Sequence, residues 1–509
     1  MTTDQGPWIV PDAVHATGAD APDASLPAVA VPAASESPNG TPTATVPGGD
    51  GFDRDTEVRG PRQFVTDYLR RVRGGEVGAL PALLGLAILV VIFSQANDQF
   101  LTTGNLANLV SQSGITTFIA MGLVFVLLLG EIDLAAGTAS GVCAATMGEA
   151  LLHNGDLHAA LGTPTYLTVL AFMVLAIGIA VWSRLWPGAV IVLAGLVMIV
   201  LQLGTATQLG AMFVAISAGV AIGLFTGALV ARVGIPSFVV TLALFLAWQG
   251  VLLQFMGNGG AIPLGQQSIV IGISNKYLDP MLGWLLFVVL VGGYAAITVL
   301  RARRRRAGGL AAEPMLIVVA RAGGLVVLGA AALWFLNQER SPNPTLTSIK
   351  GMPYVLPLIL VTMIGCTLVL NRTSFGRHLY AVGGNAEAAR RAGIDLTRMR
   401  IAAFTIGSGL AALGGIAGAS KLGDVPADAG GSNTLLFAVA AAVIGGTSLF
   451  GGRGRARDAV LGGLVISIIP NGLGLIGMPD SMKYIVTGGV LLIAASVDAL
   501  TRKRAATGR

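Results

Sequence analysis

The segment NRTSFGRHLYAVGGNAEAARRAGIDLTRMR, residues 371–400, is the longest basic and non-apolar stretch between two strongly apolar runs. A short helix is predicted inside it, because Asn385 can cap the N-terminus, Glu387 lies in the first turn and Gly393 follows the last turn. The residues between these ends, 386–392, are mostly good helix formers. A polar helix of two turns buries little surface of its own, so we expect it to be presented to a partner.

The chain as a whole is strongly apolar. Of its 509 residues 54% are hydrophobic and 11% are charged, with a mean hydropathy of +0.75, whereas soluble proteins carry about 25% charged residues. Apolar runs of about 20 residues recur and alternating barrel strands are absent, which predicts an all-α, polytopic helical membrane protein. The 70 glycines fit close helix–helix packing in lipid.

About 14 transmembrane spans are predicted from the apolar runs. The third and the twelfth are short and rich in Gly, Ala and Thr, so either can be a half-helix. In order, the runs lie near residues 79–95, 114–130, 134–152, 166–182, 188–204, 210–231, 237–256, 281–300, 314–336, 352–370, 401–418, 433–449, 458–476 and 484–499.

The basic residues predict the orientation of these spans. With the N-terminus inside, 25 of the 32 Lys and Arg fall in inside segments and 4 in outside loops. Both termini are therefore expected in the cytoplasm, with a membrane domain at 59–500, a cytoplasmic segment at 372–400 and a short cytoplasmic tail at 501–509. Residues 1–58 cannot bury enough apolar surface to fold, and no basic region precedes an apolar core in them, so a disordered cytoplasmic tail is predicted rather than a signal peptide.

Several classes of site are not indicated by the sequence. The formal charge of +6 comes from basic residues at span ends, so it does not indicate nucleic-acid binding. Cys143 and Cys366 lie inside apolar runs and are interpreted as buried small residues rather than a disulfide or metal pair. No CxxC, HExxH or G-x-x-x-x-G-K-[ST] pattern occurs, so we expect no catalytic residue, metal, cofactor or ATPase site on this chain.

Two carboxylates occur where the second and third runs meet, in GEIDLAAG at residues 130–137. Glu131 and Asp133 have no basic residue beside them, and carboxylates at membrane depth are costly unless they face a cavity or water. One reading is a helix break in which Asp133 caps a helix that starts at Leu134. The other is a polar wall of a translocation path, and the two are compatible.

Other polar interruptions are open to two readings each. In PNGLG, Pro470 is expected to kink the thirteenth span, and Asn471 either bonds a freed carbonyl or contacts a hydroxylated substrate. Arg321 either extends to the inner surface or contacts an ion or substrate. GGTSLFGGRGR at residues 445–455 lacks the context of a phosphate loop, so a broken helix with close backbone packing is preferred. The outside loop 257–280 is a connector or a docking site for an external protein.

Four of these segments, in order, resemble the permease subunits of sugar-importing ABC transporters of the ribose, xylose and galactose class. GEIDLAAG is similar to that family's G-G/E-I-D-L-S-V-G, and AVGGNAEAARRAGI at 381–394 is similar to its coupling segment A-x-G-G-N-x-x-A-A-R-L-S-G-I. GGTSLFGGRG and NGLGLIG match two further signatures, and the resemblance covers most of residues 75–500. Two extra hairpins, near 157–209 and 281–350, resemble the xylose-type subclass.

The resemblance implies a transport subunit of the bacterial plasma (inner) membrane that works with other chains. A second permease copy would complete the pore as a homodimer within the membrane lipid, and an extracytoplasmic sugar-binding protein would deliver the sugar. A separate cytoplasmic ABC ATPase would receive the short helix in a groove and drive a rigid-body movement. The residues that the resemblance assigns to this coupling are Gly384, Asn385, Glu387, Ala388, Ala389, Arg390, Arg391, Gly393 and Ile394.

Departures from the family pattern bear on the substrate. Ala135 and Ala136 replace the usual Ser-Val, which removes a possible hydroxyl contact to a sugar. Leu435 and Phe437 stand where ribose-type members look acidic, which favours xylose or a related pentose over ribose.

Two other classes of protein compete with this interpretation. An ion-coupled secondary transporter of a small polar solute would place ionisable residues in its spans, where Glu131, Asp133 and Arg321 are available. A membrane-embedded transferase would need clustered acidic metal ligands, and Asp-rich motifs are absent.

Overall fold

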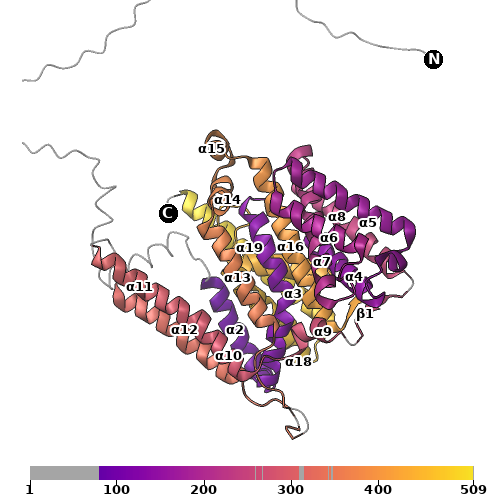
Figure 1. The fold of residues 1–509 in the computed structure, drawn as a ribbon. Helices are drawn as coiled ribbons and strands as arrows, with labels where there is room; N and C mark the ends of the chain where they lie inside the picture. Colours follow the sequence, from indigo (N-terminus) through magenta and orange to yellow (C-terminus); the bar gives the residue numbers. More distant parts are fainter. Residues whose placement is uncertain are drawn as a thin grey trace, which may run out of the picture. The chain divides into compact units, whose positions relative to one another are not determined.

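The computed structural model describes residues 80–257, 259–265, 267–308, 314–341, 343–345 and 348–507, so the predicted tail at 1–58 lies outside it. The described residues are almost entirely helical and all fall within one compact unit (Figure 1). The elements in chain order are α2 (Leu80–Ala96), α3 (Thr103–Leu128), α4 (Ala136–Leu152), α5 (Leu157–Trp182), α6 (Trp186–Leu201), α7 (Gln208–Ala228), η2 (Leu229–Val233), α8 (Ser237–Met256), β1 (Ala261–Pro263), α9 (Ser268–Asn275), α10 (Pro280–Phe287), η3 (Val288–Gly292), α11 (Gly293–Ala307), α12 (Met315–Leu336), α13 (Val355–Arg372), α14 (Ser374–Gly384), α15 (Ala386–Arg391), α16 (Leu396–Leu422), β2 (Asp424–Pro426), α17 (Ser432–Ile444), α18 (Ala456–Leu475) and α19 (Asp480–Thr507).

Each predicted apolar run coincides with a helix, with shifted ends. Within the described ranges nine helices are long and apolar enough to cross a membrane, which confirms a polytopic helical membrane protein. The twelfth run forms α17, whose 13 residues extend only about 20 Å at 1.5 Å per residue. That is less than the hydrocarbon core of about 30 Å, as a half-helix would be. Cys143 and Cys366 are free and buried, as expected.

Helix α16 forms the centre of the bundle and packs against α3, α4, α7 and α9. Small residues let these backbones approach closely. A Cβ atom built on Gly122 of α3 would lie 2.6 Å from the carbonyl oxygen of Gly407 in α16. One built on Gly219 of α7 would lie 2.7 Å from the carbonyl oxygen of Ser408. The abundant glycines therefore set the helix spacing at the core.

One end of the bundle carries α15 and several segments that were predicted to lie inside (Figure 1). Arg398, at the start of α16, donates to the carbonyl oxygen of Arg184 in the α5–α6 turn at 3.0 Å. Arg232 of η2 lies over the ring of Trp182, 4.1 Å from its centroid. The structure thus brings these inside segments together, as a single membrane face requires.

The segments that were predicted to lie outside meet at the other end. Strands β1 and β2 pair antiparallel, with Ile262 opposite Val425, and so tie the α8–α9 loop to the end of α16. The amide of Tyr354 donates to the carbonyl oxygen of Lys276 at 3.2 Å. The predicted loop 257–280 is therefore largely ordered, because it holds β1 and α9 and packs against α16.

Glu339 organises the loop between α12 and α13 at this same end. Its carboxylate accepts hydrogen bonds from the Ser348 hydroxyl at 2.7 Å and the Ile349 amide at 2.9 Å, and it pairs with Lys350 at 3.4 Å. These donors, the serine hydroxyl above all, lower the pKa of Glu339 to about 2. The loop thus has a carboxylate that stays ionised at any physiological pH.

The two extra hairpins lie at the periphery. Helices α5 and α6 pack against α7, whereas α10, η3, α11 and α12 reach the bundle mainly through α3 (Figure 1). Few residues of this second hairpin are buried, and the Arg321 side chain on α12 is exposed. The faces of both hairpins suit contact with lipid.

Candidate functional site

The short helix α15 is formed by local signals at both of its ends. The Asn385 side chain accepts a hydrogen bond from the Ala388 amide at 2.9 Å, which confirms the predicted cap. At the other end Gly393 adopts a positive φ of 83°. The Gly393 amide donates to the carbonyl oxygen of Arg390, and the Ile394 amide donates to the carbonyl oxygen of Ala389. This is a Schellman motif, which ends a helix most readily at glycine.

One face of α15 is exposed and charged. Glu387 pairs with Arg390 at 2.9 Å and with Arg391 at 3.2 Å, and all three side chains are more than half exposed. The hydrogen bonds from Arg390 and then Arg391 lower the pKa of Glu387. With Gly384, Asn385, Ala388 and Gly393 also exposed, most of the predicted coupling residues lie on a surface that a partner can reach.

The opposite face of α15 is docked on the bundle. Ala389 is 4% exposed and forms a small apolar cluster with Val382 of α14 and Met399 of α16. Leu129, at the end of α3, packs against the same cluster, as does Ile394. Two of the predicted coupling residues, Ala389 and Ile394, therefore attach the helix rather than present it.

Main-chain atoms join the same region to the loop between α17 and α18. The Gly452 amide donates to the carbonyl oxygen of Leu128 at 2.9 Å, and the Tyr380 hydroxyl donates to the carbonyl oxygen of Gly454 at 2.7 Å. A Cβ atom on Gly383 would collide with the Leu128 carbonyl oxygen. The end of α3 at Leu128, the end of α14 at residues 380–383 and the loop at residues 452–454 thus meet at one place, which we call the coupling junction.

Glu131 connects this junction to the central helix. Its carboxylate lies 2.8 Å from Nε of Arg400, near the start of α16, and its side chain is 14% exposed against 35% for the arginine. The next residue, Ile132, accepts a hydrogen bond from the Thr241 hydroxyl and its amide donates to the Ser237 hydroxyl, both at 3.2 Å. The turn after α3 is therefore bonded to both α16 and α8.

Asp133 is buried beside Glu131, and its predicted role needs correction. Helix α4 begins at Ala136 rather than at Leu134, and its N-cap residue, Ala135, makes no side-chain cap bond. The Asp133 carboxylate accepts instead from the Ala135 amide, at 2.9 Å, one residue before the helix. The acidic side chain shapes the turn that precedes α4, because it bonds two residues ahead, as in an Asx-turn.

Asn471 lies at the opposite end of the bundle from the two carboxylates. Its amide exchanges two hydrogen bonds with the amide of Asn105 on α3, at 2.9 and 3.0 Å, instead of bonding the carbonyl freed by Pro470. Pro470 lies inside α18, which continues to Leu475. The three predicted translocation-path residues are thus not one cluster, and Asn471 joins α18 to α3.

A small cavity that the sequence analysis overlooked lies between α3, α4, α16 and the chain after β2. It measures about 180 Å³, and its polar lining includes Asp424, Asp428, Ser140 and Thr434. Pockets that bind drug-sized ligands measure about 300–1,000 Å³, so this smaller cavity suits a smaller solute. Its signal in the sequence was DVPADAGG, two carboxylates directly after a glycine-rich span. None of its described lining residues is a lysine or arginine.

The chain is similar to known proteins over most of its length. A family model described as "Branched-chain amino acid transport system / permease component" matches residues 105–495. The xylose transport system permease protein of Haemophilus influenzae is 30% identical over 431 residues, which is 83% of this chain and 96% of the relative. The ribose import permease protein of Escherichia coli (strain K12) is 24% identical over 441 residues, 87% of this chain and 97% of the relative. No solved structure matches the chain significantly.

Proposed function

The chain belongs to the family of permease components of branched-chain amino acid transport systems, and from this premise we propose that it is the permease subunit of an ATP-driven sugar importer. The observation that carries the proposal is the alignment, over more than four fifths of the chain, with permeases named for xylose. The geometry of the coupling junction supports the same proposal, because it places an exposed, capped helix, α15, against the end of α3.

The ATPase would act on the permease through α15. A separate cytoplasmic ATPase would bind the face that carries Glu387, Arg390 and Arg391, and its movement would push α15 as a rigid body. The force would pass through Ala389 to Leu129, and from there to the turn before α4. The short cap-to-glycine length of the helix supports this role, because a flexible loop would absorb the displacement.

Sugar would pass beside α16, through the cavity that Asp424 and Asp428 line. Carboxylates accept hydrogen bonds from sugar hydroxyls, whereas an amino acid would also require a cation for its carboxylate. The lining has no lysine or arginine, and this favours a neutral polyol over an amino acid. Xylose or a related pentose is the proposed substrate.

The proposed topology has 14 spans, with both termini and the coupling junction in the cytoplasm of a bacterial cell and the protein in its inner membrane. Residues 59–500 would form the permease domain and 501–509 a cytoplasmic tail. A second copy would complete the pore, and an extracytoplasmic sugar-binding protein would dock at the end that holds β1 and α9. The convergence of the basic turns on one end supports this frame.

Reconstitution tests the proposal. Proteoliposomes that hold the chain with its ATPase and binding protein should take up labelled xylose only when ATP is present on the side of the membrane that carries the ATPase. Charge reversal by Glu387→Arg with Arg390→Glu should remove the ATPase from the purified complex. Asp480→Arg, a reversal of an exposed carboxylate at the other end of the bundle, is the matched control and should leave the complex intact. Uptake by the chain alone, driven by a proton or sodium gradient, would refute the proposal in favour of a secondary transporter.

A further inference from the structure

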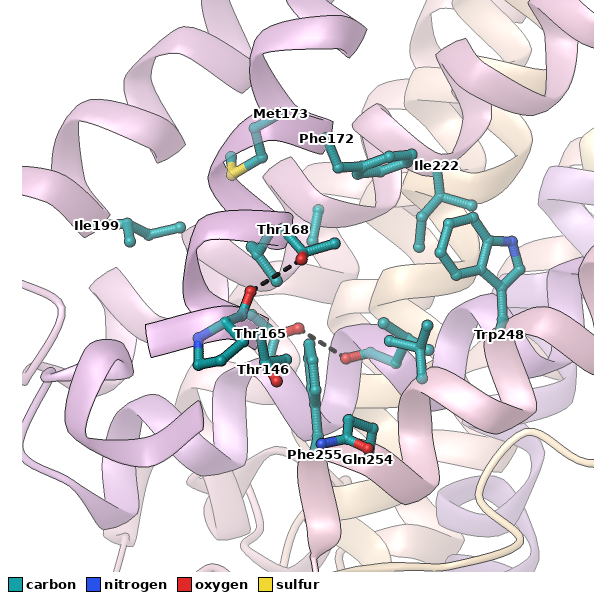
Figure 2. A pocket seen from close by; sticks show the side chains of 15 residues that line it. Thr146, Thr165, Thr168, Phe172, Met173, Ile199, Ile222, Trp248, Gln254 and Phe255 are labelled. Atoms are coloured by element: carbon teal, nitrogen blue, oxygen red, sulfur yellow. Dashed lines mark hydrogen bonds between the residues drawn. The ribbon is translucent and has the colours of Figure 1, made fainter. Parts of the chain in front are cut away.

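A cavity of about 350 Å³ lies between α4, α5, α6, α7 and α8 (Figure 2). It shares none of its described lining residues with the cavity beside Asp424, although α4 contributes to both. Its walls are mostly apolar, with Phe172, Met173 and Ile222 in the upper part of the view and Trp248 at the right (Figure 2). Among the residues that the structure describes, none with a charged side chain lines it. The first extra hairpin supplies one side of it, so the cavity depends on α5 and α6.

The walls offer few polar groups to a ligand, although the buried Nε1–H of Trp248 has no hydrogen-bond partner in the part of the chain that the structure describes. The Thr146 hydroxyl already donates to the carbonyl oxygen of Val142 at 2.8 Å, and the Thr168 hydroxyl donates to that of Pro164 at 2.9 Å (Figure 2). A sugar here would bury hydroxyl groups with few partners, which costs free energy. The physical chemistry of the cavity therefore favours an apolar ligand.

Polarity is graded along the cavity. Gln254 and Thr165 lie at the end away from Trp248, where α5 begins and α8 ends, with the ring of Phe255 beside them (Figure 2). Thr165 and Met173 are eight residues apart on α5, or about 12 Å at 1.5 Å per residue. A ligand that is polar at one end and apolar along the rest would match this gradient.

The cavity opens toward the side of the bundle that faces lipid. Helix α5 is broken at Gly162, with a φ of 71°, and the exposed Pro164 begins its next turn at the rim. Next to the lining, Leu167 of α5 is 57% exposed and Leu253 of α8 is 49% exposed. Large apolar side chains exposed on membrane helices lie against acyl chains, so lipid is the medium at the rim.

We propose that this cavity binds one acyl chain of a membrane phospholipid, with the polar headgroup at the Gln254 end and the chain directed toward Trp248. Ala218 shows how the space is kept open. It is partly exposed on α7, although its neighbours Ser217 and Gly219 are buried, because it faces the cavity. The bound chain would complete the packing between α5 and α7.

Native mass spectrometry of the chain purified with phospholipid tests the proposal. The wild-type chain should retain one more phospholipid than Ala218→Phe, whose added ring fills the cavity. Ala171→Phe makes the same change at an exposed position of α5 outside the lining, and it should retain the wild-type number. Ile199→Phe fills the cavity from α6 and replaces Ala218→Phe if that variant does not fold. Equal retention by a folded filling variant and by the control would overturn the proposal.

Fluorescence in nanodiscs of brominated phospholipid gives a second, independent reading. The contribution of Trp248 to the fluorescence is the difference between the emission of the wild-type chain and that of Trp248→Phe. Although Trp248 is only 9% exposed, a chain in the cavity should quench its emission, and Ala218→Phe should relieve at least half of that quenching. Unquenched Trp248 emission in the wild-type protein would overturn the proposal.

Discussion

The ion pair between Glu131 and Arg400 is expected to hold the turn after α3 to the central helix. Exposed ion pairs contribute about 0.2–1 kcal/mol, whereas removal of one partner from a buried pair costs about 3–5 kcal/mol. This pair lies between the two cases, because the carboxylate is 14% exposed and the guanidinium 35%. We therefore expect Glu131→Gln, which keeps the size of the side chain, to lower the free energy of unfolding by about 1–3 kcal/mol.

A double-mutant cycle isolates the interaction. Glu131→Gln, Arg400→Gln and the double variant, compared by denaturant unfolding in detergent, should give an interaction energy of about 1–2 kcal/mol. The pair of Lys483 and Asp480, at 2.7 Å within one helix, is the control and should give no more than about 0.5 kcal/mol. In proteoliposomes Glu131→Gln should also lower sugar uptake per ATP hydrolysed. An interaction energy no larger than the control's would refute the reasoning.

Three further predictions concern other parts of the molecule. Gly122→Ala should lower the free energy of unfolding by about 1–3 kcal/mol, because the added methyl group meets a backbone carbonyl of α16, whereas Gly250→Ala, with no atom within 4 Å, should raise it slightly. Equal shifts in thermal unfolding would contradict this contrast. Asn471→Leu leaves the Asn105 side-chain oxygen without its donor, although the Asn105 nitrogen still donates to the Phe100 carbonyl oxygen, and it should cost about 1–3 kcal/mol; a double variant with Asn105→Leu should recover part of that loss. The depressed pKa of Glu339 stabilises its loop above the ordinary value of 4.5, and this contribution is lost only as the pH falls through about 2. Pepsin at pH 3 should therefore cut this loop faster in Glu339→Gln than in the wild-type chain.

Local chemistry explains what could be predicted from the sequence. The short helix between Asn385 and Gly393 was correctly located because a cap and a C-terminal glycine act over a few residues. The apolar runs predicted their helices for the same reason, since hydropathy is a property of each run. Contacts over long separations carried no such signal, so neither the docking of Ala389 beside Leu129 nor the partner of Glu131 could be foreseen.

The sequence was least informative where polar residues had several possible partners. Asp133 had two amides within reach, and only the backbone conformation of the turn determined that it bonds Ala135 ahead of the helix. Asn471 pairs with a residue on a different helix. Asp424 was overlooked because no motif marks it after the apolar run, whereas the pairing of β2 with β1 folds it against the cavity.

The hydrogen bond from the Gly452 amide to the Leu128 carbonyl has a consequence for evolution. Because main-chain atoms make it, most side-chain changes nearby leave it in place, provided that the glycine is kept. Under the proposed function, permeases that have diverged in sequence can therefore share this main-chain connection between the ATPase-binding segment and the bundle. We expect hybrid importers, in which a distant relative's ATPase replaces the one proposed for this chain, to retain transport more often than whole-chain identity would indicate.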